Sequence, residues 1–196
     1  MELKYNYECI LSILVENQPS ILTRIVGLFT RRGFIINSLA VGTTEYSGFS
    51  RIVIALTANL RMIDQVTRQL YKIFPTVKVF NLTNIPSITR ELILIKVLSS
   101  IEERRQILEI ANIFNAIIVD CTNRTITLEI TGDSKKIVAI EQMLHKFGIL
   151  EIVRTGKIGL TIESLTSGQL YKTEREVLRR KMTNSHVLEI ETKLYL

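Results

Sequence analysis

The sequence predicts an α+β fold: two tandem βαββαβ units of the ferredoxin-like kind, followed by a C-terminal extension. Three observations support it. The order strand, helix, strand, strand, helix, strand occurs twice along the chain. A proline-containing stretch at 84–87 separates the two copies. Apolar residues make up 46% of 196 residues, which suffices for two packed cores. We expect the divisions 1–84, 85–160 and 161–196.

The first unit is predicted from hydrophobic periodicity. Strand-length apolar runs lie at 7–15, 35–43, 50–58 and 76–83. Apolar residues at helical spacing predict a helix over 20–32 and another that ends before Pro75. Pro19 suits the first turn of the earlier helix, because a missing N–H costs nothing there, and Gly33 suits its end.

The second unit repeats this order. Strand-length runs lie at 91–99, 116–122, 125–131 and from 149 onward. Helical spacing covers 102–114 and 134–146, with Ser134 as the expected N-cap and Gly148 past the helix end. In the extension, 170–181 has the pattern of a charged amphipathic helix and 187–196 alternates like an edge strand.

Composition argues against several functions. The net charge of +6 comes from 25 basic and 19 acidic residues spread along the chain, which does not indicate a nucleic-acid groove. An RNA-recognition module shares the predicted topology and is the structural alternative. Its third strand carries aromatic residues that stack on bases, whereas the matching positions here are Arg51 and Ile54. We therefore expect no nucleic-acid partner, and no apolar run is long enough to cross a membrane.

The residues that usually carry catalysis are sparse. Cys9 and Cys121 each lie in an apolar run and are expected to be buried free thiols in a reducing compartment. His145 and His186 have no carboxylate or thiol at a useful spacing, and no phosphate-binding glycine loop is present. We expect no catalytic residue, no metal site and no cofactor in this chain.

The junction between the first strand and the first helix is the candidate binding site. Free amides at a helix start, together with the helix dipole, suit a carboxylate. Asn17 lies where the strand meets the helix. The neighbouring apolar residues could enclose a branched side chain; they are Ile21, Leu22, Ile35 and Ile36. A plain helix cap with core contacts is the alternative, and chemistry alone leaves both open.

A long motif extends through this junction. ENQPSILTRIVGLFTRRGFIINSLAVG at 16–42, followed by Ser50-Arg51-Ile52, resembles the ACT domain of the regulatory small subunit of acetolactate synthase (acetohydroxyacid synthase). The likeness covers about 6–160. It continues through RELILIKV at 90–97, IFNAIIVDCT at 113–122 and EIVRTGKIGL at 151–160.

The resemblance implies a non-catalytic subunit in valine, leucine and isoleucine biosynthesis. Such a subunit dimerises through its ACT domains, binds and activates the large catalytic subunit, and confers feedback inhibition by valine or a related branched-chain amino acid. Thiamine diphosphate, Mg and FAD belong to the catalytic subunit. A stand-alone amino-acid sensor with another partner is the alternative.

The resemblance also implies where the effector lies, which is between two ACT domains with its carboxylate on helix-start amides. Asn17 matches the asparagine of the family motif. Ser20 replaces the glycine of the family motif, and Ile35 replaces an asparagine. Asn37, two residues further along the strand, could substitute for that lost amide.

The N-terminus has no pattern of a secretory or transit peptide. This fits a plastid-encoded protein of the plastid stroma, which the isoleucine-rich composition favours, or a bacterial cytoplasmic protein.

Overall fold

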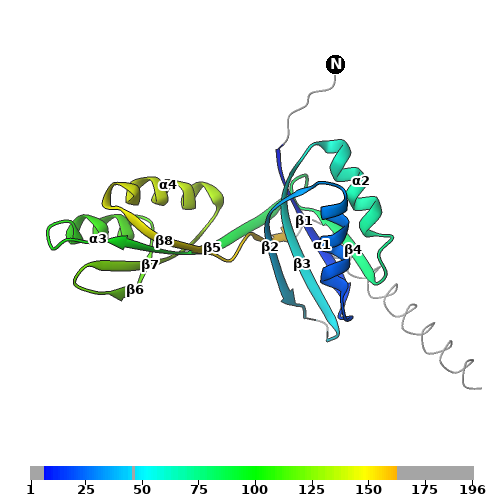
Figure 1. Cartoon of the computed structure of the whole chain (residues 1–196), viewed down its shortest axis with the longest axis horizontal. Coiled ribbons are helices and arrows are strands. Elements are labelled where there is room, and N and C mark those ends of the chain that lie inside the picture. Colours follow the sequence, from blue (N-terminus) through cyan, green and yellow to red (C-terminus); the bar gives the residue numbers. More distant parts are fainter. Residues whose placement is uncertain (1–6, 46, 163–196) are drawn as a thin grey trace, which may run out of the picture. The chain divides into compact units, whose positions relative to one another are not determined.

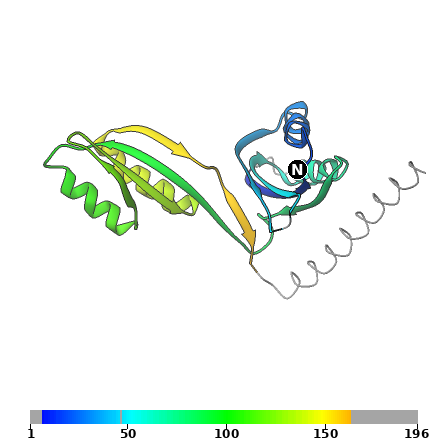
Figure 2. The same ribbon diagram turned by 90° about the horizontal axis from the view of Figure 1, so that it is seen from below.

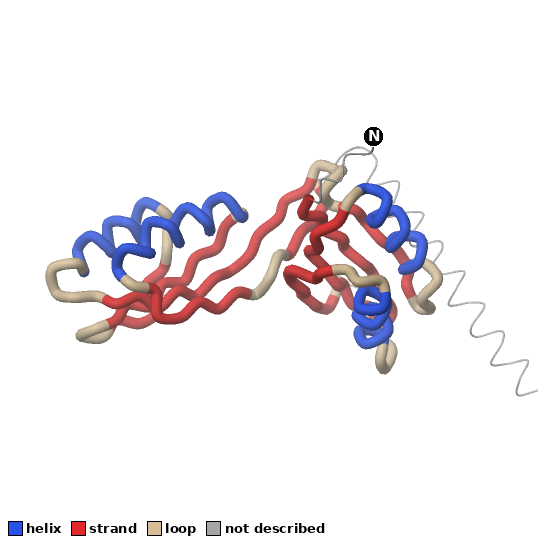
Figure 3. The backbone as a smooth tube through the Cα atoms, turned by 45° about the horizontal axis from the view of Figure 1, so that its top comes forward, coloured by secondary structure: helices blue, strands red, loops and turns tan. Residues whose placement is uncertain are grey.

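The computed structural model describes residues 7–45 and 47–162, which form two antiparallel sheets, each covered by helices on one face (Figures 1 and 3). The predicted α+β fold with two βαββαβ units is confirmed. The helix expected at 170–181 and the strand expected at 187–196 lie outside the described residues.

The first sheet has the strand order β2-β3-β1-β4. Its strands are β1 (Tyr7–Glu16), β2 (Ile35–Thr43), β3 (Phe49–Ala58) and β4 (Thr76–Asn81). The helices α1 (Ile21–Arg31) and α2 (Leu60–Leu70) cover one face (Figure 2). The central strands pair antiparallel without a break, from Tyr7 opposite Ala58 to Glu16 opposite Phe49. Gly33 follows α1 with φ 68°, the left-handed conformation that glycine adopts without strain.

The second sheet has the order β6-β7-β5-β8, and β9 also pairs with β5. Its strands are β5 (Ser87–Leu98), β6 (Ile117–Cys121), β7 (Thr125–Gly132), β8 (Ile149–Arg154) and β9 (Ile158–Thr161). The helices are α3 (Arg104–Ile113) and α4 (Ser134–Leu144), and a 3-10 turn, His145–Phe147, follows α4. The connection between β4 and β5 comprises residues 82–86, so it begins two residues earlier and ends one residue earlier than the linker expected at 84–87.

Each sheet has its own hydrophobic core. Alternate residues of β1, from Cys9 to Val15, point toward α1, where Ile25 and Phe29 are fully buried. In the second core, Ile93, Ile95 and Val97 of β5 pack with the inner faces of α3 and α4; the helix residues include Ile107, Ile110, Ile137, Ile140 and Leu144. Burial of one such side chain stabilises the fold by about 1.5–3 kcal/mol.

Two helix starts differ from the prediction. Helix α1 begins at Ile21, so Pro19 lies in the turn before the cap rather than in the first helical turn. At α4 the N-cap is Asp133 and not Ser134. Asp133 has an extended backbone (φ −79°, ψ 169°), and its Oδ1 accepts a hydrogen bond from the Lys136 amide at 2.9 Å. Both residues are good caps by type, and the backbone conformation decides between them.

The two thiols lie in different environments. Cys9 is fully buried, as expected, and burial raises the pKa of its thiol. Cys121 is exposed, which contradicts the expectation. The reason is that β6 is the edge strand of its sheet, and all five of its residues are exposed.

This difference predicts selective alkylation. In the native protein at pH 8, iodoacetamide should modify Cys121 within minutes, whereas Cys9 should react only after unfolding, because a buried, protonated thiol is a poor nucleophile. Mass spectrometry of tryptic peptides measures both rates. Cys121→Ser is the control, since it should abolish the fast phase. Equal rates for the two thiols in native protein would contradict the burial of Cys9.

Candidate functional site

The turn between β1 and α1 is fixed by the start of β3. The Asn17 amide donates to the Gly48 carbonyl at 2.8 Å, and the Ser50 hydroxyl donates to the Asn17 Oδ1. Asn17 is exposed, and in the described part of the chain its side-chain NH2 donates no hydrogen bond. Because the oxygen is occupied, Asn17 presents a donor, which suits a carboxylate.

The first turn of α1 has no side-chain cap. Ser20, the N-cap residue, has φ 64° and ψ 6°, and its side chain makes no capping hydrogen bond. Within residues 7–45 and 47–162, no acceptor is paired with the amides of Leu22 and Thr23. The first turn also contains no acidic residue. The helix start therefore keeps its unpaired donors and the positive end of its dipole.

Two other helix starts, those of α2 and α4, are capped by side chains of the chain itself, whereas α3, like α1, has no side-chain cap. Asn59 caps α2 by accepting from the Met62 amide at 3.0 Å, and Asp133 does the same for α4. In α2 and α4, helix-start amides donate to the capping side chains. In α1 these amides remain available to an anion.

The apolar residues predicted for the site fall into two groups. Ile21 and Ile36 are partly buried and pack against the first core, so they hold α1 and β2 in place. Leu22, with 38% of its surface exposed, lies beside the free amides, and Ile35 is 69% exposed on β2. Ile35 is therefore not a core residue in this chain.

Asn37 and Ile35 share a neighbour on β3, Thr57. Ile35 lies opposite Thr57 on β3, and the register of the pairing shifts between Ile36 and Ser38, at Asn37. The Asn37 Nδ2 donates to the Thr57 hydroxyl at 3.0 Å. Ile35, Asn37 and Thr57 therefore form one polar and apolar patch at the start of β2.

One chain does not bring this patch to the start of α1. Asn17 is bonded to Ser50, near the beginning of β3, whereas the patch is at Thr57, seven residues further along that strand. At about 3.4 Å per residue the separation is on the order of 20 Å. The predicted residues therefore form two half-sites at opposite ends of the sheet.

Sequence reasoning missed the residues that hold the half-sites, Gly48, Ser50 and Thr57. The Ser50-Arg51 motif was visible, but the bond from Ser50 to Asn17 depends on strand register. In the described residues no group of three His, Cys, Asp or Glu side chains could hold a metal ion. No helix of that part is long and apolar enough to cross a membrane.

Two family models match the chain in order. An acetohydroxyacid synthase (AHAS) small subunit-like ACT domain matches residues 11–78, and the model described as the small subunit of acetolactate synthase matches residues 90–163. The first match falls within the first βαββαβ unit, and the second covers the second unit from residue 90, in β5, onward.

Individual proteins are similar over the same region. A probable acetolactate synthase small subunit of Archaeoglobus fulgidus is 43% identical over 150 residues, which are 76% of this chain and 94% of that protein. The acetolactate synthase small subunit of Mycobacterium leprae is 42% identical over 77% of this chain and 89% of its own length. The chloroplastic small subunit 2 of Arabidopsis thaliana is 44% identical over 79% of this chain, but the match spans only 32% of that longer protein.

A solved structure has the same fold. The crystal structure of an acetolactate synthase small subunit from Thermotoga maritima superposes with a TM-score of 0.74 and 34% identity. The match covers 81% of this chain and 99% of that one.

The conformation of Ser20 predicts the effect of restoring glycine. Ser20→Gly should increase the free energy of unfolding by about 0.5–1 kcal/mol, because relief of the left-handed strain exceeds the added entropy of the unfolded chain. Chemical denaturation measures it. Ser134→Gly, the same substitution at a helical position, should instead lower stability by about 0.5 kcal/mol. A loss at both sites would contradict a strained Ser20.

Proposed function

Because this chain belongs to the acetolactate synthase small-subunit family, we propose that it is the non-catalytic subunit that binds and activates the thiamine-diphosphate-dependent catalytic subunit. The observation that carries this proposal is the similarity to complete small subunits, such as the 94% of the Archaeoglobus fulgidus protein matched at 43% identity. Thiamine diphosphate, Mg and FAD are assigned to the catalytic subunit. The acetolactate formed by that subunit then enters valine, leucine and isoleucine biosynthesis.

Residues 1–84 are assigned dimerisation and effector binding, and 85–160 form the second domain. The proposed dimer pairs β2 antiparallel with β2 of a second copy. Two features of β2 support this pairing. It is an edge strand with unpaired backbone groups. It also exposes Ile35 and Val41, which are 69% and 51% accessible.

This pairing unites the half-sites. If the two strands pair about Leu39, Ile35 of the second copy lies opposite Thr43, whose neighbour on β3 is Ser50. Ser50 donates to Asn17, so the patch of one copy arrives beside the open start of α1 of the other. Two such sites form per dimer, related by the two-fold axis.

A branched-chain amino acid such as valine fits this combined site. Its carboxylate accepts from the Leu22 and Thr23 amides and from the Asn17 NH2. Leu22 and the second copy's Ile35 and Ile36 segment enclose the branched side chain. Asn37 supplies the amide that Ile35 lacks. Binding there changes the activity of the complex and constitutes allosteric feedback inhibition.

The plastid stroma is the proposed location, with a bacterial cytoplasm as the alternative. A chloroplastic relative and the Mycobacterium leprae relative are 44% and 42% identical to this chain, so family membership is compatible with either location.

Reconstitution tests the proposed function. The full chain mixed with its catalytic subunit should raise acetolactate formation several-fold, and millimolar valine should reduce the gain. Failure to activate at any ratio would overturn the activating role. Amino-acid binding by calorimetry, combined with a pull-down that recovers no thiamine-dependent enzyme, would point to the stand-alone sensor instead.

The substitution Ile35→Asn should strengthen feedback inhibition by valine. The new amide should lower the half-maximal inhibitory concentration of valine about tenfold, because a polar contact to a ligand contributes on the order of 1–3 kcal/mol. Inhibition curves of the reconstituted complex measure the shift. Ile117→Asn, on the exposed edge of the second sheet, is the matched control and should leave the curve in place. Identical curves for both variants would remove Ile35 from the site.

A further inference from the structure

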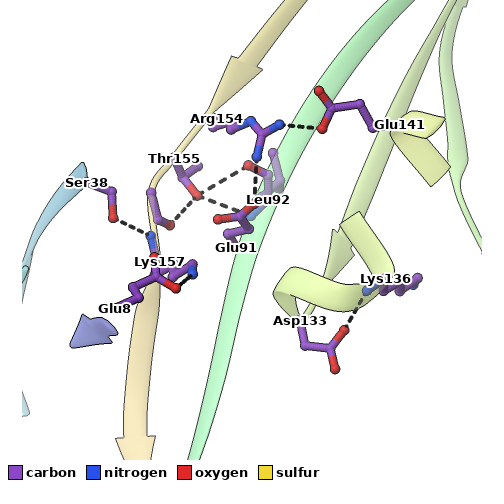
Figure 4. Close-up of polar contacts among 11 residues, drawn as sticks. Glu8, Ser38, Glu91, Leu92, Asp133, Lys136, Glu141, Arg154, Thr155 and Lys157 are labelled. Carbon is purple, nitrogen blue, oxygen red and sulfur yellow. Dashed lines mark hydrogen bonds and ion pairs between the residues drawn. The ribbon is translucent and has the colours of Figure 1, made fainter. Parts of the chain in front are cut away.

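The segment that joins β8 to β9 contacts β2, the strand that carries Ile35 and Asn37 (Figure 4). The Lys157 amide donates to the Ser38 hydroxyl on β2 at 3.2 Å. The Lys157 ammonium forms an ion pair with Glu8 on β1, and only 13% of the lysine side chain is exposed. These residues are 119 and 149 positions apart in sequence, so the contacts are purely tertiary.

Gly156 allows this approach. Its φ is +84°, and the residue is buried. A Cβ at this position would lie 3.0 Å from the Ser38 Cβ, closer than most Cβ contacts, and 3.4 Å from its hydroxyl. Both the backbone conformation and the space therefore favour glycine.

The other end of the segment is anchored in the second sheet. The Thr155 amide donates to the Leu92 carbonyl at 3.1 Å, and the Leu92 amide donates to the Thr155 hydroxyl at 3.2 Å. Arg154 pairs with Glu91 at 3.4 Å and with Glu141 on α4 at 2.6 Å. Glu91 has a side chain that is only 7% exposed. Figure 4 shows these polar contacts, which extend along residues 154–157 from Glu141 at one end to Ser38 at the other.

The contacts meet β2 at the candidate effector patch. Ser38 follows Asn37 directly. Glu8 lies opposite Thr57 in the sheet, and Thr57 is the residue that Asn37 bonds. Lys157 therefore contacts β2, the strand that carries Asn37, and β1, which lies on the other side of β3. Asn37, Ser38, Arg154 and Lys157 also line one pocket of about 510 Å³.

We propose that Gly156 and Lys157 are positioning residues for β2, and that residues 154–157 couple β2 to α4. The role in effector response rests on the proposed function, whereas the bracing of β2 does not. Effector contact with Asn37 shifts β2, and Ser38 and Glu8 pass that shift to a segment whose other end holds α4. Removal of the brace should loosen β2 and weaken the response without touching the ligand.

Hydrogen exchange of the ligand-free full chain tests the bracing. Lys157→Met retains the aliphatic stem and removes the charge, so the amides of 36–41 should exchange threefold to thirtyfold faster. Lys96→Met is the matched control, because Lys96 forms a surface ion pair with Glu151 at 3.7 Å within the second sheet, and it should leave β2 unchanged. Equal β2 exchange in the two variants would overturn the bracing role.

Reversal of the pair separates the ion pair from the loss of lysine itself. Glu8→Lys combined with Lys157→Glu should return β2 exchange toward wild type, whereas either single change should not. Gly156→Ala gives an independent variant, checked for folding by circular dichroism, and should accelerate the same amides. Failure of the reversed pair to restore exchange, with Gly156→Ala also unchanged, contradicts the proposal.

The coupling is measured with valine. In wild type, valine should slow exchange in 36–41 and in 154–157 together; in Lys157→Met, only the first segment should respond. In the complex of Lys157→Met with the catalytic subunit, the half-maximal inhibitory concentration of valine should be at least threefold higher than in wild type. A wild-type chain whose 154–157 amides ignore bound valine has no such coupling. If valine fails to bind at all, the proposed effector fails, while the ligand-free exchange still decides the bracing.

Discussion

The antiparallel pairing of β1 with β3 sets the geometry of the candidate effector site in the first domain. Ten consecutive residue pairs fix where both ends of the sheet lie. At one end, β3 brings Gly48 and Ser50 to Asn17, which holds the loop before α1 open. At the other end, the pairing places Glu8 opposite Thr57, and so beside Asn37. A slip of one residue would turn every side chain to the opposite face and separate both sets.

A rigid ladder of this length also explains why the candidate site is divided. The donors at α1 and the patch at β2 are held apart by the same strand, and no loop movement within one chain can bring them together. In the proposed dimer a second copy supplies the missing half, which would link effector binding to dimerisation. An amino acid bound across two copies stabilises the dimer, and dilution of the dimer weakens binding of the amino acid.

Much of this fold could be predicted, because strand and helix periods are local properties. The range 35–43 for β2 agreed to the residue, and Gly33 ended α1 as its backbone freedom suggests. The errors arose where local patterns are ambiguous. Asp133 and Ser134 are equally good caps by residue type. An apolar run does not reveal whether its strand is central, as for Cys9, or at an edge, as for Cys121. The contact between Lys157 and Ser38 has no local signal, since it depends on the packing of segments far apart in sequence.

The residue that replaces glycine before α1 illustrates the same point. Only the backbone shows that Ser20 occupies a left-handed conformation, which is the physical reason that a glycine suits that loop. The serine retains the loop shape at a cost in stability, and its side chain takes no part in capping the helix.

The exposed edge strand β6 sets a condition on how the protein must be produced. Its apolar residues Ile117, Ile118 and Val119 face solvent beside an unpaired strand backbone, which is a template for irregular association with other chains. At high concentration, free chains are expected to aggregate through this edge. The edge therefore limits the concentration at which the free chain stays dispersed.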